Sequence, residues 1–410
     1  MSDSEIGSQK GNRSIQRRKV LKGIAAAGAT AMFGGQAPAV FGQARPPLKI
    51  GALLTLSKVL AQSGEDHLRG MRQYLDEINW EVAGRKIELI REDDEANPQV
   101  GLQKARKLIE SDQVDFICGP QASNVAFALI NYLRSTKTFW ILSGAGVTGL
   151  TWERIPHMFR TSFSVFQLTK PIADYVYDNI AKEVLMTGTD FAGGRDVLAE
   201  FRSAFTRRGG KIIKEIYPPL GTNDFSAYLA DVRSINPPAT YSFYAGTDAV
   251  RFVKQYEEFG LKGKIPMTGF SALFDGDALP GQGRSALGGI SSTLYTDTID
   301  NAENRKFVST YRSKHEGYPS LYTEFGYVAA KVLTDAAKAT NGDTRNLERL
   351  TQAISAMQFN APRGPMRFDP VVHNPIQNVY IREVAEIDGR VANKVIATFK
   401  EVRDPGVKGG

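Results

Sequence analysis

The chain has 410 residues, of which 42% are hydrophobic, and it carries a formal net charge of +7 at pH 7. Its first 44 residues hold six basic and two acidic side chains, so only about +3 of that charge belongs to the rest of the chain. This charge is too small for a nucleic-acid-binding footprint, and we expect no nucleic-acid partner. The single cysteine, Cys118, cannot form an internal disulfide and is expected to be a packed core thiol.

The N-terminal segment predicts export. Residues 17–22 (RRKVLK) are typical of a twin-arginine signal, and a soft apolar stretch follows from residue 23 to residue 33. Residues 41–44 (FGQA) offer a cleavage site after Ala44, with residues 37–39 (APA) as the alternative. The apolar stretch is too short and too rich in Gly and Ala for a membrane helix. We therefore predict a twin-arginine signal peptide over 1–44, passage through the Tat translocase, and a mature protein in the periplasm.

After residue 45 the chain alternates strands with helices. Strand-like runs at 48–54, 86–90, 114–118 and 138–142 are separated by helical patterns at 68–78, 98–109 and 123–134. A second series of the same rhythm has helices at 165–180, 196–207, 224–234 and 248–259, with strands at 184–186, 211–217, 240–244 and 264–268. This alternation predicts an α/β fold with parallel sheets, helices on both faces, and two lobes.

The last third of the chain follows a Gly-rich loop predicted at 275–290. Helices are predicted at 302–315, 322–339 and 346–357, and strand-like runs at 379–386 and 391–399. No low-complexity segment occurs after residue 45.

Few residue patterns favour catalysis or metal binding. The four histidines have neither metal-ligand spacing nor a nucleophile-elbow context. Residues 65–67 (EDH) are interpreted as the polar first turn of a helix, with a weak metal cluster as the alternative. Residues 92–95 (EDDE) are interpreted as a solvated acidic turn. We therefore predict a protein that is not an enzyme and that needs no metal or cofactor.

Residues 144–149 (GAGVTG) match the dinucleotide pattern G-x-G-x-x-G but not its context. The motif follows the fourth strand-like run, a short Pro-terminated segment comes after it, and no acid lies about 20 residues on. Its backbone N–H groups still lie beyond the carboxyl end of a strand, where they suit an anion. A second turn, 119–124, opens a helix with Ser123 at the predicted N-cap. Ser123 can bind a carboxylate there, or it can merely cap the helix.

A set of motifs spread over the mature chain carries a family resemblance. In order, these are LKIGALLTLS (48–57), GMRQYLDEIN (70–79), VDFICGPQASNVAFAL (114–129), FWILSGAGVTGLT (139–151), FRTSFS (159–164), FAGGRDVLAEFRSAFTRRGGKI (191–212), YAGTDAVRFVKQYEEFGL (244–261) and PRGPMRFD (362–369). The ordered set resembles the periplasmic leucine/isoleucine/valine-binding protein family, the type I solute receptors of ATP-driven importers. The resemblance implies two Rossmann-like lobes joined by a three-crossover hinge that closes over a ligand. Lobe one would hold 45–162 and 292–368, and lobe two 163–291 and 369–410.

The resemblance also implies ligand-binding positions. Ser123 matches the serine that binds the ligand carboxylate, and Ala145 fits the position of a backbone contact to the head group. The family's hydroxyl contact falls on Val147, with Thr148 beside it. Phe191 matches a tyrosine of lobe two and keeps the ring without the hydroxyl. Ser63 is a further candidate ligand contact.

The chain departs from the family where the ligand ammonium is bound. Phe270 or Ser271 stands where the family places a glutamate, and an ammonium buried without a charge partner costs several kcal/mol. Lys58 stands at the cleft mouth where the family has glycine. Together with the aromatic side chains of Phe191, Tyr244 and Phe270, these changes favour a carboxylate without an α-amine, such as an aromatic or fatty acid.

We predict an exported, monomeric solute-binding protein of an ABC transporter. It would capture a small carboxylate, either an amino acid or an aromatic or other organic acid, and deliver it to the permease subunits. A ligand sensor that signals to a membrane receptor is one alternative. An exported nicotinamide-dependent oxidoreductase is the other.

Overall fold

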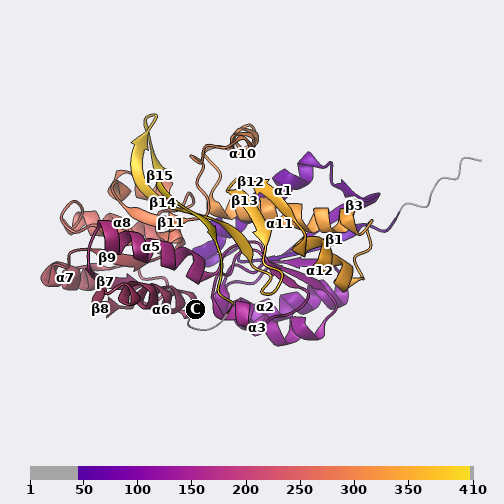
Figure 1. The fold of residues 1–410 in the computed structure, drawn as a ribbon, viewed down its shortest axis with the longest axis horizontal. Coiled ribbons are helices and arrows are strands. Elements are labelled where there is room, and N and C mark those ends of the chain that lie inside the picture. Colours follow the sequence, from indigo (N-terminus) through magenta and orange to yellow (C-terminus); the bar gives the residue numbers. More distant parts are fainter. Residues whose placement is uncertain (1–44, 407–410) are drawn as a thin grey trace, which may run out of the picture. The chain divides into compact units, whose positions relative to one another are not determined.

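The computed structural model describes residues 45–406, and these form two α/β lobes, each built on a sheet with helices against it (Figure 1). The predicted signal segment, residues 1–44, lies outside the described residues. None of the helices within 45–406 is long and apolar enough to cross a membrane.

The first lobe contains a six-stranded sheet in the order β2-β3-β1-β4-β5-β6. Its strands are β1 (Leu48–Leu54), β2 (Glu81–Val82), β3 (Arg85–Asp93), β4 (Phe116–Cys118), β5 (Phe139–Leu142) and β6 (Met158–Arg160). Its helices are α1 (Ala61–Glu77), α2 (Pro98–Arg106), α3 (Ser123–Ser135) and the single turn α4 (Gly149–Trp152). All of its pairings are parallel except that between β2 and β3, which confirms the predicted parallel sheet.

The second lobe contains a nine-stranded mixed sheet. Its parallel part comprises β7 (Glu183–Gly188), β8 (Lys211–Ile216), β9 (Thr240–Phe243), β10 (Met267–Gly269) and β11 (Ile290–Thr293). The antiparallel part comprises β12 (Gln358–Ala361), β13 (Gly364–Phe368), β14 (Pro375–Ile387) and β15 (Arg390–Val402). Helix α5 (Val165–Asn179) precedes β7, and α6 (Ala192–Arg207), α7 (Ser226–Ile235) and α8 (Gly246–Glu258) connect successive parallel strands from β7 to β10. The prediction of a plain loop over 275–290 was wrong, because this segment contains α9 (Leu279–Gln282) and a 3₁₀ turn (Gly283–Ala286).

The segment after β11 returns to the first lobe. It contains α10 (Ala302–Arg312), α11 (Leu321–Ala339) and α12 (Leu347–Ser355), and α11 lies directly against α1 (Figure 1). A Cβ atom at Gly70 would lie 1.7 Å from the carbonyl oxygen of Thr323, and one at Gly326 would lie 1.9 Å from that of His67. The two helix backbones therefore touch, and only glycine fits at both positions.

Buried arginines hold the crossover segments together. Arg363, fully buried, donates to Glu324 Oε1 on α11 at 2.8 Å, to the carbonyl oxygen of Thr161 at 3.0 Å and to Gln377 Oε1 on β14 at 3.0 Å. Arg160, at the end of β6, donates to the carbonyl oxygens of Ala145 and Phe163 at 2.7 Å each. These bonds join the end of the first sheet to α11 and to β14.

The lobe boundaries at 162/163, 291/292 and 368/369 stay a prediction.

Two interpretations of polar runs were wrong. The acidic run 92–95 is not simply a solvated turn, because Asp94 is fully buried and accepts a 2.6 Å hydrogen bond from Thr55 Oγ1. Likewise, α1 begins at Ala61, so residues 65–67 lie in its second turn and His67 is fully buried. Burial lowers the pKa of His67 to about 3. The structure confirms Cys118 as a core thiol, and burial raises its pKa to about 12.

Candidate functional site

A small cavity lies where the turns that follow β4 and β5 meet residues of the second lobe. Its volume is about 70 Å³, and it is lined by Leu60, Gln121, Ala122, Ser123, Gly144, Gly146, Phe163, Val165, Phe191, Gly193, Val197, Phe243, Ala245, Phe270, Ala272 and Tyr322. Several of these residues directly follow strand ends, the position at which open α/β sheets bind ligands. None of the lining side chains is charged. We call this space the interlobe cavity.

The glycines of 144–149 provide room for two residues that line the interlobe cavity. A Cβ atom at Gly144 would lie 2.8 Å from Cα of Gln121, and one at Gly146 would lie 2.0 Å from Cε2 of Phe163. The backbone N–H of Ala145 donates to the carbonyl oxygen of Pro120 at 2.9 Å, which joins this turn to the turn after β4. The helix that the motif opens, α4, has only four residues. The turn therefore shapes a wall and does not continue into a nucleotide-binding helix.

Two helix N-termini face the interlobe cavity from opposite lobes. Helix α3 begins at Ser123, and α6 begins at Ala192, directly after Phe191. A Cβ atom at Gly193 would lie 3.6 Å from Ser123 Oγ, so the two helix starts are neighbours. The first N–H groups of a helix have no partner within the helix, and the helix dipole is positive at this end. This arrangement favours an anion between α3 and α6.

Ser123 does not have the N-cap position that the sequence predicted for it. The N-cap of α3 is Ala122, and Ser123 is the first helical residue. Its side chain is buried and lines the cavity, and its hydroxyl bonds to no other residue within 45–406. The prediction of an N-cap at Ser123 was therefore wrong by one position, and the hydroxyl is free to bind a ligand.

Phenylalanine rings form the apolar wall. The Phe270 ring centroid lies 5.5 Å from that of Phe163 and 5.5 Å from that of Phe243. Phe243 in turn lies 6.0 Å from Phe191. These are the tilted and edge-on spacings that aromatic rings prefer, and such a wall suits a flat apolar ligand.

The candidate residues predicted from the sequence divide into three groups. Ser123, Phe191 and Phe270 line the interlobe cavity together. Ala145, Val147 and Thr148 are buried behind its wall. The carbonyl oxygens of Ala145 and Val147 accept hydrogen bonds from Arg160, and the N–H of Thr148 donates to Asp196 Oδ2 at 2.9 Å. In this arrangement these polar groups are already engaged by protein partners.

The other four candidates lie outside the cavity lining. Lys58 is exposed and pairs with Glu95 at 2.9 Å. Tyr244 is buried behind the sheet, with its hydroxyl 2.6 Å from Thr187 Oγ1. Ser271 donates its hydroxyl to Thr293 Oγ1 at 3.1 Å. Ser63 donates to Asp277 Oδ2 at 2.5 Å.

The contacts of Ser63 and Thr148 join the two lobes. Ser63 lies on α1 and Asp277 follows β10, whereas Thr148 precedes α4 and its partner Asp196 lies on α6. The lobes are thus in contact through two side-chain hydrogen bonds. Burial raises the pKa of the half-buried Asp277 to about 7, and the negative charges of Asp275 and Asp66 contribute to this rise.

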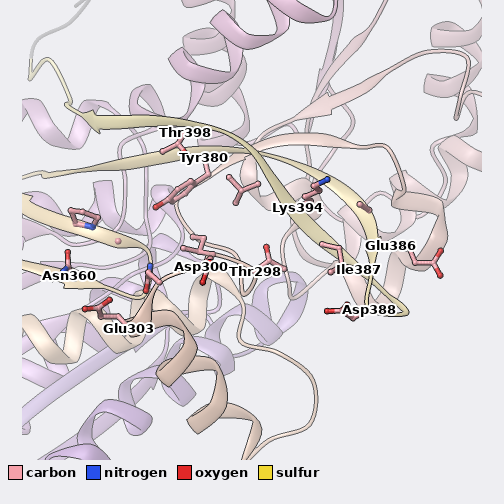
Figure 2. Close-up of a pocket in the computed structure, with 16 residues that line it drawn as sticks. Thr298, Asp300, Glu303, Asn360, Tyr380, Glu386, Ile387, Asp388, Lys394 and Thr398 are labelled. Atoms are coloured by element: carbon pink, nitrogen blue, oxygen red, sulfur yellow. The ribbon is translucent and has the colours of Figure 1, made fainter.

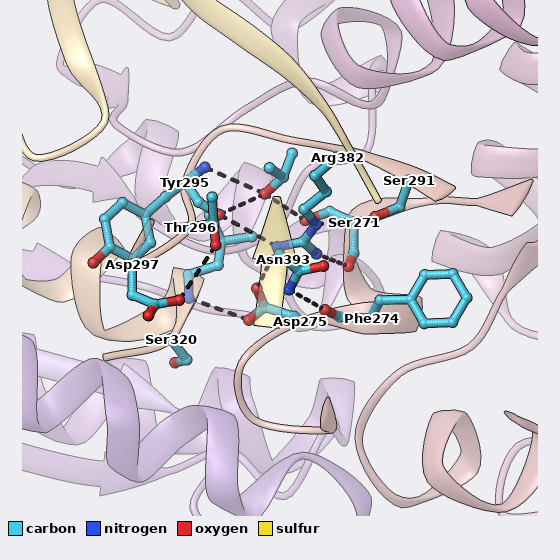
Figure 3. A network of polar contacts seen from close by, with 12 residues as sticks. Ser271, Phe274, Asp275, Ser291, Tyr295, Thr296, Asp297, Ser320, Arg382 and Asn393 are labelled. Atoms are coloured by element: carbon cyan, nitrogen blue, oxygen red, sulfur yellow. Dashed lines mark hydrogen bonds and ion pairs between the residues drawn. The ribbon is translucent and has the colours of Figure 1, made fainter. Parts of the chain in front are cut away.

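Arg382 and Asp275 form a buried ion pair in the second lobe (Figure 3), two residues before Asp277 in the chain. Arg382 on β14 lies 3.4 Å from Asp275 Oδ1 and donates to the carbonyl oxygen of Ser271 at 2.7 Å. The other oxygen of Asp275 accepts from the N–H of Leu321 at 3.2 Å, at the start of α11. The pair therefore fixes the segment that carries Phe270 and Ser271 against α11.

A larger groove lies beside the β14–β15 hairpin (Figure 2). It has a volume of about 990 Å³, and Asp300, Glu303, Glu386 and Asp388 are among the residues that line it. These carboxylates disfavour an anionic ligand, and Lys394 is the only basic side chain in the lining. The uncharged interlobe cavity is therefore the better candidate for a carboxylate.

Sequence reasoning selected the turn 119–124 but missed Gln121. Its Oε1 accepts a hydrogen bond from the N–H of Thr55 at 3.2 Å, and its Nε2 has no partner among the described residues. The signal that could have identified it is its position in the turn after a buried strand, two residues before Ser123. Phe163, Phe243 and Tyr322 were also missed as lining residues.

Comparisons with known proteins agree with this architecture. The sequence profile of a family described as "Periplasmic binding protein" matches residues 47–390. "Leu/Ile/Val-binding protein homolog 6" of Brucella melitensis biotype 1 is 30% identical over 368 residues, which cover 88% of this chain and 94% of that protein.

Two solved structures are also similar. An ABC transporter substrate-binding protein from Sphaerobacter thermophilus superposes with a TM-score of 0.83 at 36% identity, covering 88% of this chain and 100% of that one. A solute-binding protein of an ABC transporter from Rhodopseudomonas palustris BisB5, in complex with 3,4-dihydroxybenzoic acid, superposes with a TM-score of 0.84 at 32% identity, covering 88% and 99%.

Proposed function

The chain belongs to the periplasmic binding protein family, and on that premise we propose that it captures an aromatic carboxylate for an ABC importer. The observation that carries this proposal is the lining of the interlobe cavity. It combines an uncharged phenylalanine wall with the hydroxyl of Ser123 and the N-terminal ends of α3 and α6. The phenylalanine wall suits the apolar ring of such a ligand, and the Ser123 hydroxyl and the helix N-termini suit its anionic head group.

The same lining disfavours a free amino acid. An α-ammonium group needs an acidic partner when it is buried, and no Asp or Glu lines the interlobe cavity. Phe270 or Ser271 stands at the position at which the resemblance places the ammonium-binding glutamate. The aryl acid bound by the similar Rhodopseudomonas palustris protein supports the same ligand class.

Ligand entry requires the lobes to separate. The cavity volume of about 70 Å³ is smaller than the cavity of about 150 Å³ that accommodates benzene in an engineered protein. Opening would break the contacts of Ser63 with Asp277 and of Thr148 with Asp196. Closure around the ligand would re-form these contacts with the lining side chains moved apart to enlarge the cavity, and the closed form would be delivered to the permease. We also propose that the chain acts as a monomer in the periplasm after Tat-dependent export.

Calorimetry of the chain without its signal segment tests the proposal. We expect saturable binding of benzoate, weaker binding of acetate, which lacks the ring, and no binding of leucine. Mass spectrometry of ligand released from protein purified from its native host should identify an aryl acid. Tight leucine binding without benzoate binding would overturn the proposal.

A further inference from the structure

Gln121 lines the interlobe cavity and has an unused hydrogen-bond donor. The side chain is 8% exposed and lines the cavity, two residues before Ser123. Its Oε1 is engaged by the N–H of Thr55 at 3.2 Å, which fixes which end of the amide is which. The Nε2 group is buried and has no partner among the described residues. A buried donor left unpaired costs about 1–3 kcal/mol, so a ligand acceptor at this position restores a lost interaction.

The surroundings hold Gln121 in place. Gly144 packs so closely that a Cβ atom there would lie 2.9 Å from Cγ of Gln121. The turn that carries Gln121 is fixed on both sides, because Pro120 accepts from the N–H of Ala145 at 2.9 Å and Gly119 accepts from Trp140 Nε1 at 2.6 Å. The amide is therefore preorganised before the ligand arrives.

We propose that Gln121 determines the charge specificity of the site, its Nε2 donating to one oxygen of the ligand carboxylate while Ser123 Oγ donates to the other. This inference rests on the proposed function, since it assigns a role within the same cavity. Both donors belong to the turn that opens α3, whose positive end adds to the attraction for an anion. No basic side chain lines the cavity, so neutral donors carry the recognition.

The substitution Gln121→Glu isolates the donor. It keeps an acceptor for the N–H of Thr55 but replaces the donating NH₂ group with a second oxygen. Two facing carboxylates repel, and a charge-assisted hydrogen bond is lost, so benzoate affinity should fall by about 10- to 100-fold. Affinity for benzamide, whose NH₂ group can donate to the new carboxylate, should stay unchanged or rise. A merely structural role for Gln121 would weaken both ligands together.

Titration calorimetry at pH 8 would compare benzoate and benzamide on the native chain, on Gln121→Glu and on Gln121→Met. Gln99→Glu, on the exposed face of α2, is the control for the change in net charge. Gln121→Met removes the donor without adding charge and should also lose benzoate affinity by about tenfold. Thermal unfolding of each variant checks that it folds.

The outcomes separate the inference from the proposed function. If Gln121→Glu binds benzoate within threefold of the native chain, or loses both ligands equally, the role of Gln121 is overturned while the proposed function stands. If the native chain binds neither benzoate nor another small carboxylate, the proposed function is overturned, and the inference with it.

Discussion

Removing the Arg363 side chain should lower the free energy of unfolding by about 3–5 kcal/mol, because the carboxylate of Glu324 stays buried without its cation. Arg363 and Glu324 are both 0% exposed. The guanidinium also donates to the carbonyl oxygen of Thr161 and to Gln377 Oε1, each at 3.0 Å, and it lies 4.9 Å from the ring centroid of Phe325. Arg363→Met therefore removes the side-chain donor from three acceptors. The loss is a large share of the typical free energy of unfolding of about 5–15 kcal/mol.

Equilibrium unfolding in urea gives the measurement. The cycle comprises the native chain, Arg363→Met, Glu324→Leu and the double variant, all at pH 7. The double variant should be more stable than Arg363→Met, because no buried charge remains unpaired. A loss below about 1 kcal/mol in Arg363→Met would refute the reasoning, since it would mean that the pair stabilises no more than a surface ion pair.

The pH dependence provides an independent check on the same pair. Burial raises the pKa of Glu324, and the charge of Arg363 opposes that rise. Without Arg363 the pKa of Glu324 should rise further, so the folded state would hold a proton that the unfolded state has released. A raised pKa in the folded state favours folding at low pH. The difference in free energy of unfolding between the native chain and Arg363→Met should therefore shrink as the pH falls from 8 to 5. A difference that stays constant or grows as the pH falls would contradict the inference that Arg363 lowers the pKa of Glu324.

Three further predictions concern the helix crossing and the cleft. Gly70→Ala should lower the free energy of unfolding by about 1–3 kcal/mol, because its Cβ atom would lie 1.7 Å from the carbonyl oxygen of Thr323; urea unfolding would measure this, and an unchanged midpoint would contradict it. Benzoate affinity should fall as the pH rises through about 7, because Asp277 holds a proton when the lobes are closed and its ionisation opposes their closure. Calorimetry should find no such pH dependence in Asp277→Asn. Ser123→Ala should weaken benzoate binding more than Thr148→Ala, because the hydroxyl of Thr148 already accepts from the N–H of Phe166 at 3.3 Å; equal effects in calorimetry would mean that the two turns are misassigned.

The long elements of the fold could be predicted because their apolar spacing is regular. The missed strands are short: β2, β6, β11, β12 and β13 have two to five residues each. β12 and β13 also pack on one lobe while pairing with the other, since Met366 and Phe368 join the core of the first sheet and β13 bonds to β14. Local periodicity carries no information about such tertiary pairing.

The site was harder to predict than the fold because adjacent residues at a strand end face opposite ways. Sequence reasoning selected Tyr244, but its neighbour Phe243 lines the interlobe cavity and Tyr244 packs against Phe252 on the other side. A shift of one position along a strand reverses the direction of a side chain. The same uncertainty affected the turn 119–124, where Ser123 was selected and Gln121 was not. A resemblance between turns locates the segment, but the facing direction depends on packing across the cleft.

The glycines of 144–149 illustrate why a nucleotide-like pattern can serve another ligand. In both cases glycine is needed where a backbone must approach something closely. Here the close neighbours are protein side chains, Gln121 against Gly144 and Phe163 against Gly146. One glycine thus positions the polar end of the interlobe cavity and the other positions its aromatic wall. Gly144→Ala should therefore weaken benzoate binding through displacement of Gln121, and an unchanged affinity in calorimetry would contradict this role.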